Sequence, residues 1–541
     1  MQNIEKYYQK QNIEYLKQTY GKELWIQVSG RKDMNGADAA FWAALVTLTD
    51  LNDVYNDFSW DAHQETQLPG FVLYGNENAK YERITSLGTY CEHIVNYRDF
   101  YGIKPNYIEI VEEFRLLNNL YHDINTNIFY AIHNNGECEE VAKIEHNENV
   151  FIKLKYLINY ATAKQMALLL FFDIRTKFSG TLETNSLKEF SESFRNDYLV
   201  YNIWGDEMTG FNSVYSVLMG KKIILPKAVE ECGYWPYEKE LEYLDFIIGT
   251  DEYGEPKTYS SNYKSLANNF GANPDAPHYL TPVFFKKEVL QKYLSRPDIY
   301  SVEDGYLRCK SLWGIAIDNH HKEYITVYLG DLGRDLPTSE QSYWKAYNTI
   351  PDGSLSDVKY KRDFLCFPAE AEISDLKFKS EFSKFQKQWH SKFNWFFFLP
   401  LADDDEYNFE QMRIPVVNTQ TEFDYLVLSL VKTVIDSINE KEVMNNLNDK
   451  TDKTNGCSLK GSISKLERWF EELNLPQYNT HIEFLRDLQG LRSSGTGHRK
   501  GSNYDKISKK FGLDKNSFVD AFDEILQKTN SFLQFLTQNF L

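Results

Sequence analysis

The sequence predicts a multidomain α+β protein whose last quarter is an all-α bundle of four helices. At 541 residues the chain is too long for one hydrophobic core. Its 42% apolar and 25% charged residues are typical of globular domains. The apolar pattern changes twice along the chain, which predicts a mixed helix and strand domain over 1–195, a strand- and loop-rich middle domain over 196–410 and the helical domain over 411–541.

In the first domain, residues 1–60 are expected to be mostly helical, with a strand-like run after Pro69 and Gly70. Apolar residues at helical spacing in 107–124 predict one helix with a buried stripe. Alternating residues on both sides of an Asn-Asn-Gly turn predict a β-hairpin over 127–144. The apolar run that follows predicts a helix over 154–172.

The middle domain contains short apolar runs separated by segments rich in Gly, Pro, Asn and Asp. These runs predict strands over 246–251, 281–285, 312–318 and 324–330.

The helical domain opens at Thr419, which stands three residues before Glu422 at the spacing of a capping box. An apolar stripe over five turns follows, and the polar segment 446–459 is expected to be a flexible connection. Further helices are predicted over 461–474, 480–493 and 514–540, which together make a bundle. The last helix is apolar around much of its girth, so we expect it to be central or covered by a partner.

Composition narrows the class of protein. There is no apolar run of membrane-spanning length, and the polar first residues do not resemble a signal peptide, so we expect a cytoplasmic protein with no membrane partner. The six cysteines form no Cys-x-x-Cys pair, which argues against a disulfide framework and a zinc site. Residues 411–541 hold 17 basic and 17 acidic residues, so the first 410 residues carry the whole net charge of −19.

Arg492 and His498 stand out in this neutral tail, with Ser-Ser-Gly-Thr-Gly between them. Arg492 follows Leu485 and Leu488 at helical spacing, which predicts that it projects from the packed side of its helix. The glycines between the pair would let the backbone turn or approach a ligand. Six basic residues and one acidic residue lie within 492–510, a local positive patch of the kind that phosphate binding requires.

This segment resembles the motif of HEPN ribonucleases, an Arg and a His separated by four to six residues in a four-helix bundle. The resemblance covers about the last quarter of the chain and implies an endoribonuclease that uses no metal or other cofactor. Histidine titrates in the range needed to exchange protons with the ribose 2′-OH and the leaving oxygen, and Arg binds phosphate through a planar fork. The resemblance therefore implies Arg492 and His498 as the catalytic pair, with RNA contacts from Ser493, Arg499, Lys500, Asn503 and Lys506. Many members carry Asn, Asp or His where this chain has Ser493.

The family resemblance also implies biological partners. HEPN nucleases usually dimerise so that two motifs face one cleft, and many act in anti-phage or toxin-like defence. We therefore expect an RNA substrate, a homodimer through the bundle, and a phage-derived or protein trigger. The acidic first 410 residues would sense that trigger or restrain the nuclease, for example by mimicking RNA against the basic patch.

Several alternatives stay open at this stage. The bundle could be a non-catalytic dimerisation or nucleotide-binding module, or the segment could be a plain helix end with basic residues and a glycine loop. A third possibility places chemistry in 195–410, where no convincing site is found. The sequence has no phosphate-binding glycine loop and no nucleophile elbow.

Other patterns have simpler explanations. Arg115 and His122 have a similar spacing, but we expect them in one continuous helix, with Arg115 paired to neighbouring acids. We interpret His320-His321 and the segment 251–257 as hairpin turns, and the acidic run 403–406 as a solvated loop.

Overall fold

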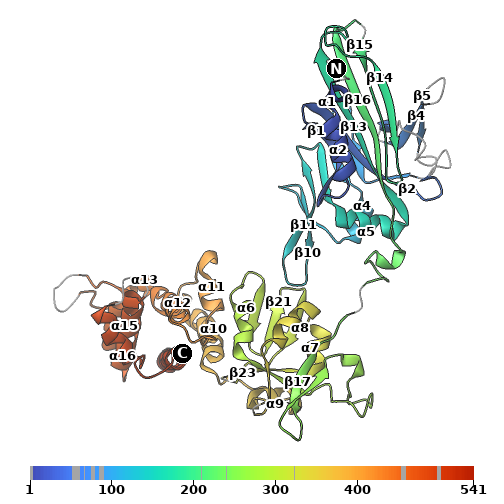
Figure 1. Cartoon of the computed structure of the whole chain (residues 1–541). Coiled ribbons are helices and arrows are strands. Elements are labelled where there is room, and N and C mark those ends of the chain that lie inside the picture. Colours follow the sequence, from blue (N-terminus) through green and yellow to red (C-terminus); the bar gives the residue numbers. More distant parts are fainter. Residues whose placement is uncertain are drawn as a thin grey trace. The chain divides into compact units, whose positions relative to one another are not determined.

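The computed structural model describes residues 4–51, 61–65, 68–74, 79–83, 91–208, 210–238, 241–321, 323–351, 353–451, 458–495 and 501–541. Contacts between Cα atoms divide the chain into two units, labelled along the chain in Figure 1. One unit comprises Met1–His133 and Glu137–Glu240, and the other comprises Asn134–Gly136 and Leu241–Leu541. The fold is mixed α and β, with a large antiparallel sheet in the first unit and a helical C-terminal region in the second.

The first unit is built on a sheet with the order β14-β15-β16-β13-β2-β1-β12-β11-β10-β9, with β6 beside β2. Each of these neighbours pairs antiparallel. The strands are β1 (Trp25–Met34), β2 (Ala37–Thr47), β6 (Cys91–His93), β9 (Tyr121–Asp123), β10 (Ile128–Ile132), β11 (Cys138–Glu145), β12 (Asn149–Lys153), β13 (Met166–Ser179), β14 (Phe190–Arg195), β15 (Leu199–Met208) and β16 (Ser213–Ile224). Smaller sheets pair β3 (Asp61–Glu65), β4 (Leu68–Tyr74) and β5 (Ala79–Arg83), and pair β7 (Val95–Arg98) with β8 (Tyr107–Ile110).

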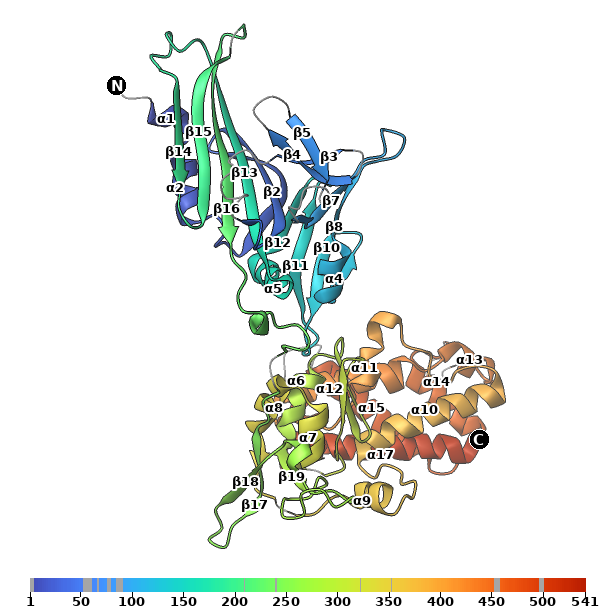
Figure 2. The ribbon, with the colours of Figure 1, turned by 90° about the vertical axis from the view of Figure 1, so that its right-hand side faces the viewer.

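Strand β13 shows why this sheet forms. Its alternate residues Leu168 and Leu170 belong to one buried cluster, and Leu169 and Phe171 belong to another on the opposite face. Burial on both faces explains the continuous apolar run of this strand. Figure 2 shows β13, β15 and β16 as long neighbouring strands.

Helices of the first unit contribute to the larger of the two clusters. Leu16 of α2 (Lys10–Gln18), Phe114 of α4 (Glu112–Leu117) and Tyr160 of α5 (Leu154–Lys164) all pack into it. The short helix α1 (Glu5–Tyr8) precedes them.

The structure corrects three predictions for this unit and confirms one. Strands β1 and β2 occupy much of the segment 1–60 that was expected to be helical. The segment 107–124 is not one helix, because it holds β8, α4 and β9 in turn. The helix predicted over 154–172 ends at Lys164, where Gln165 takes a left-handed φ of 51°, and β13 follows. The predicted hairpin is confirmed as β10 and β11.

The second unit begins with a strand-rich part that has its own core. Phe246, Phe285, Ile325 and Trp344 are central to that core. Its sheets are β17 (Asp245–Thr250) with β18 (Pro256–Ser260); β23 (Tyr324–Tyr328), β19 (Pro282–Lys286) and β24 (Asn348–Thr349); and β20 (Tyr300–Glu303), β21 (Tyr306–Cys309) and β22 (Trp313–Ala316). Its helices are α6 (Gln291–Leu294), α7 (Leu329–Asp335), α8 (Thr338–Lys345) and α9 (Asp357–Phe364). β17, β19, β22 and β23 confirm the strands predicted for this region.

The rest of the second unit is helical. Its helices are α10 (Ser374–Phe393), α11 (Tyr407–Glu410), α12 (Gln420–Val431), α13 (Glu440–Asn445), α14 (Ser462–Glu472), α15 (Tyr478–Gly495), α16 (Ser502–Lys510) and α17 (Phe518–Phe540), with a π-helical turn Lys432–Asp436 after α12. As predicted, the Thr419 hydroxyl accepts a hydrogen bond from the Glu422 amide and caps α12. The predicted helices correspond to α12, α14, α15 and α17, whereas α16 was not predicted.

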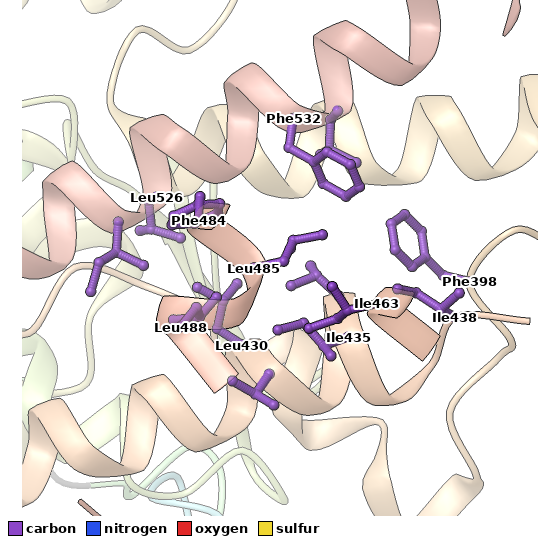
Figure 3. Close-up of a cluster of buried hydrophobic side chains, with 14 of the residues drawn as sticks. Phe398, Leu430, Ile435, Ile438, Ile463, Phe484, Leu485, Leu488, Leu526 and Phe532 are labelled. Carbon is purple, nitrogen blue, oxygen red and sulfur yellow. The ribbon is translucent and has the colours of Figure 1, made fainter. Parts of the chain in front are cut away.

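One hydrophobic core joins these helices. Figure 3 shows part of it, with side chains from α12, the π-helical turn, α14, α15 and α17 converging. Helix α10 belongs to the same core through Phe378, Phe382, Phe385 and Trp389, although its residues were assigned by sequence to the middle domain. α17 packs lengthwise on α10, so its apolar surface is covered within the chain. Among the described residues, no helix is long and apolar enough to cross a membrane.

Candidate functional site

Arg492 lies near the C-terminal end of α15, on the last turn of that helix. Leu485, Leu488 and Leu491 of the same helix are buried in the core. The Arg492 side chain is 35% exposed, so it lies at the border of the packed face. The prediction that Arg492 projects from the packed side is therefore confirmed only in part.

The Arg492 guanidinium faces an acidic residue across the bundle. Its Nη2 lies 3.7 Å from Oδ2 of Asp436, whose side chain is 41% exposed. Asp436 is the last residue of the π-helical turn that continues α12. Such turns shift the register of a helix by one residue and occur frequently at functional sites. A long, partly exposed contact of this kind contributes little to stability.

Gly495 ends α15 at a close approach to two other helices. A Cβ atom at this position would lie 3.2 Å from Cε2 of Tyr504 on α16 and 3.6 Å from Oδ1 of Asp424 on α12. Gln420 connects the same two residues, because its Nε2 donates to Asp424 Oδ1 at 2.8 Å and to the Tyr504 hydroxyl at 2.9 Å. The start of α12, the end of α15 and the start of α16 therefore meet at one point.

The structure describes only some of the other predicted site residues. Ser493 is exposed, and its hydroxyl donates to the Gln489 carbonyl at 3.0 Å, within its own helix. Lys506 is exposed on α16. Asn503 belongs to α16, but its side chain lies outside the description. His498, Arg499 and Lys500 lie outside the described residues, so the structure does not show whether they approach Arg492.

The predicted positive patch is smaller than its sequence suggests. Lys510 donates to both carboxylate oxygens of Asp487, at 2.8 and 2.9 Å, and that hydrogen bond raises the pKa of Lys510. Lys506 and Lys509 are exposed, and neither has an ion-pair partner among the residues that the structure describes. Two of the predicted cations are therefore available on α16, and one is already neutralised by α15.

His481, the one histidine of α15, was not singled out by sequence. His481 stacks near Phe535, with ring centroids 4.6 Å apart, and burial lowers its pKa. It lines a cavity of about 220 Å³ with Asp487, Lys510 and Lys528. His481 precedes Arg492 by eleven residues, and at 1.5 Å per residue the two lie roughly 16 Å apart along the helix. His481 therefore does not form a site with Arg492.

Arg115 and His122, the other Arg and His with a similar spacing, both have structural contacts. Arg115 on α4 donates to Glu112 at 2.9 Å, which confirms the predicted ion pair. The sequence predicted His122 on the same helix as Arg115, but this prediction is wrong. His122 lies on β9, where its ring stacks on Phe129 with centroids 4.1 Å apart.

The remaining candidates are structural. His320 Nε2 lies 2.7 Å from Asp304 Oδ1, and Arg362 also binds Asp304 at 2.7 and 2.8 Å. Although burial alone would raise it, the pKa of Asp304 is lowered by the hydrogen bonds from Arg362 and His320. The segment 251–257 is the turn between β17 and β18, as predicted. Within the described ranges, no group of three His, Cys, Asp or Glu residues is arranged to hold a metal ion.

Comparison with protein-family models, with characterised proteins and with solved structures finds no match to this chain.

Proposed function

We propose that the helical C-terminal region is a HEPN-type, metal-independent endoribonuclease in which Arg492 and His498 act together. The observation that carries this proposal is the position of Arg492. Its side chain is 35% exposed near the end of α15, beside the buried leucines of that helix. His498 follows three residues after Gly495, the last residue of that helix, and precedes α16 by four residues.

The proposed reaction uses both groups of the pair. His498 takes the proton of the ribose 2′-OH, the 2′-oxygen attacks phosphorus, and the bond from phosphorus to the 5′-oxygen breaks. The same histidine then returns a proton to the 5′-oxygen, which leaves a 2′,3′-cyclic phosphate and a 5′-hydroxyl end. Arg492 stabilises the charge on the phosphate oxygens. Arg499, Lys500 and Lys506 would bind the RNA backbone, with Ser493 and Asn503 as further polar contacts.

The biological setting is also part of the proposal. We propose an anti-phage or toxin-like role, in which the residues before α10 sense a trigger or restrain the nuclease. A homodimer through the bundle follows from the resemblance alone. The apolar surface of α17 does not require a partner, because α10 already packs on it.

The test is a cleavage assay with the full chain and total RNA in EDTA. We expect Arg492→Ala and His498→Ala to slow cleavage by about 100-fold or more, the usual contribution of a positioned acid–base or charge-stabilising group. Arg486→Ala on the same helix and His390→Ala on α10 are matched controls, because both side chains are exposed. Cleavage that needs a divalent ion, or that survives His498→Ala, would contradict the proposal.

A trigger requirement calls for a second readout. If the purified protein is silent, we expect expression to arrest growth in cells that supply the trigger, and Arg492→Ala to abolish the arrest while Arg486→Ala does not. Equal toxicity of these two variants would contradict a role for Arg492 in catalysis.

A further inference from the structure

A cavity of about 440 Å³ lies within the second unit, where its strand-rich and helical parts meet. This volume is in the range of small-molecule sites in proteins. Its strand-rich wall comes from α6 and β20, and its helical wall from α10 and the end of α11. The cavity does not overlap with the surroundings of Arg492.

One side of the cavity is apolar and rigid. Tyr293 is fully buried, and its ring meets Tyr300 edge to face, with centroids 5.0 Å apart and planes at 83°. The Tyr293 hydroxyl donates to Glu340 at 2.6 Å and accepts from Nε1 of Trp344 at 2.7 Å, which fixes the ring. Ile299 and Val302 complete this apolar wall.

The other side of the cavity carries two cations and two anions. These are Lys310, Lys379, Glu303 and Glu410. Among the described residues, none of the four has an oppositely charged side chain within ion-pair distance. The cavity is thus lined by balanced charges that do not neutralise each other directly.

Lys379 is the most constrained of these charges. It is half-buried on α10, and its Nζ donates to the backbone carbonyl of Glu410 at 2.5 Å. Burial lowers the pKa of Lys379, although Asp375, Glu410 and Glu303 oppose that effect. A desolvated ammonium of this kind gains from an anionic partner that enters the cavity.

We propose that this cavity binds a small zwitterion with a bulky apolar side chain, that is, a free α-amino acid of the phenylalanine or leucine type. Lys379 and Lys310 bind its carboxylate, and Glu303 and Glu410 bind its ammonium group. The apolar side chain packs against Leu294, Pro297 and Val302, the partly exposed apolar residues of the lining. A ligand with only one charge would make only half of these charged contacts, so we expect it to bind more weakly.

The position of the cavity means that a bound ligand would contact both parts of the second unit. It would bridge β20 to α10, and α10 packs directly on α17 in the core of the helical region. A ligand that holds the two walls together therefore stabilises the second unit by mass action.

The test is isothermal titration calorimetry on the full chain with L-phenylalanine, L-leucine and L-tryptophan. We expect at least one of them to bind, and its analogues that lack the carboxylate or the ammonium group to bind about tenfold more weakly or worse. For L-phenylalanine these analogues are 2-phenylethylamine and 3-phenylpropionate. Absence of binding by all three amino acids, or equal binding of the singly charged analogues, would overturn the proposal.

Substitutions of single residues test which side chains bind the carboxylate of the ligand and which bind its ammonium group. Lys379→Met and Glu410→Gln should each weaken binding of the amino acid about tenfold. Lys379→Met should not weaken binding of the amine analogue, and Glu410→Gln should not weaken binding of the acid analogue. Lys384→Met, an exposed lysine on the same helix, is the matched control. If Lys379→Met melts below the assay temperature, Lys310→Met replaces it. Identical affinities for wild type and the cavity variants would also overturn the proposal, and no arm of the test depends on RNA cleavage.

Discussion

At the scale of single residues, the contact between Arg492 and Asp436 bears on the proposed RNA site. An ion pair at 3.7 Å between two side chains that are more than a third exposed contributes little to stability. A phosphate group presents more acceptor oxygens and greater charge than one carboxylate. We therefore consider Asp436 a competitor that phosphate displaces, and not a fixed structural partner.

Asp436→Asn should tighten RNA binding about two- to five-fold, because it removes a charge that competes for Arg492 at a cost of at most about 1 kcal/mol. The dissociation constant would be measured by fluorescence anisotropy in the His498→Ala background, so that the RNA stays intact. Asp275→Asn, at an exposed position in the strand-rich part of the second unit, controls for net charge. Weaker binding by Asp436→Asn would mean that Asp436 positions Arg492 for RNA.

A residue-scale prediction for the first unit concerns Glu139. Burial would raise the pKa of this carboxyl group, but hydrogen bonds from Lys153, Tyr156 and His133 outweigh burial and lower the pKa to about 2. An unfolded glutamate titrates near about 4.3. The ionised form is thus favoured in the folded state, so Glu139 stabilises the fold at neutral pH and loses this contribution as pH falls from about 5 toward 2.

Glu139→Gln should therefore lower the free energy of unfolding by about 1–2 kcal/mol at neutral pH, as expected for a charged hydrogen-bonded group with 26% exposure. The difference from wild type should narrow between about pH 5 and 3. Denaturant unfolding at each pH measures it, with the exposed neighbour Glu140→Gln as control. A difference that stays constant over this range would contradict the assigned pKa.

At the scale of elements, the sequence predicted correctly those helices and strands whose structure is decided by residues within the segment itself. α12 was predictable because its Thr419 cap and helical periodicity agree, α15 and α17 because of helical periodicity, and the β10–β11 hairpin because its turn residues are specific. The run over 154–172 is apolar in both α5 and β13, and only the left-handed residue Gln165 separates them. Periodicity cannot distinguish a buried helix from a strand buried on both faces.

Other elements depend on distant partners. β1 and β2 are strands because they pair with β12 and β13, more than a hundred residues away in sequence. The candidate site was also only partly predictable from the sequence. The helical tail with its glycines and basic residues selected Arg492, but Asp436 was found only through the π-helical turn, which leaves no clear sequence signal.

Helix α10 supports an element-scale prediction about the extent of the helical region. Its aromatic residues are part of the same core as α17, and Asn530 of α17 donates to the Ser374 carbonyl at 2.9 Å. A fragment of residues 371–541 should therefore unfold cooperatively, whereas 411–541 should aggregate or lose fixed tertiary structure, because it exposes the face that α10 covers. Near-UV circular dichroism and size-exclusion chromatography would distinguish them. A cooperatively folded monomer of 411–541 would show that α10 is dispensable.

At the scale of the whole molecule, the boundary between the acidic and neutral segments of the sequence does not coincide with the boundary between the two structural units. The net charge of −19 resides in the first 410 residues, whereas the boundary between the two units falls near residue 240. The second unit thus combines a strand-rich part over 241–370, with 14 basic and 19 acidic residues, and a helical part over 371–541, with 22 basic and 25 acidic residues. In our account the proposed ligand cavity lies at the junction of these parts, and the proposed nuclease site lies in the helical part alone.

The most direct test of the central claim is cleavage of one RNA oligonucleotide by the full chain in EDTA, beside the same sequence with 2′-deoxyribose at the cleaved position. We predict cleavage of the ribose strand alone, with 2′,3′-cyclic phosphate ends, and its loss in His498→Ala and Arg492→Ala. Cleavage of the 2′-deoxy strand, or undiminished cleavage by His498→Ala, would contradict the account.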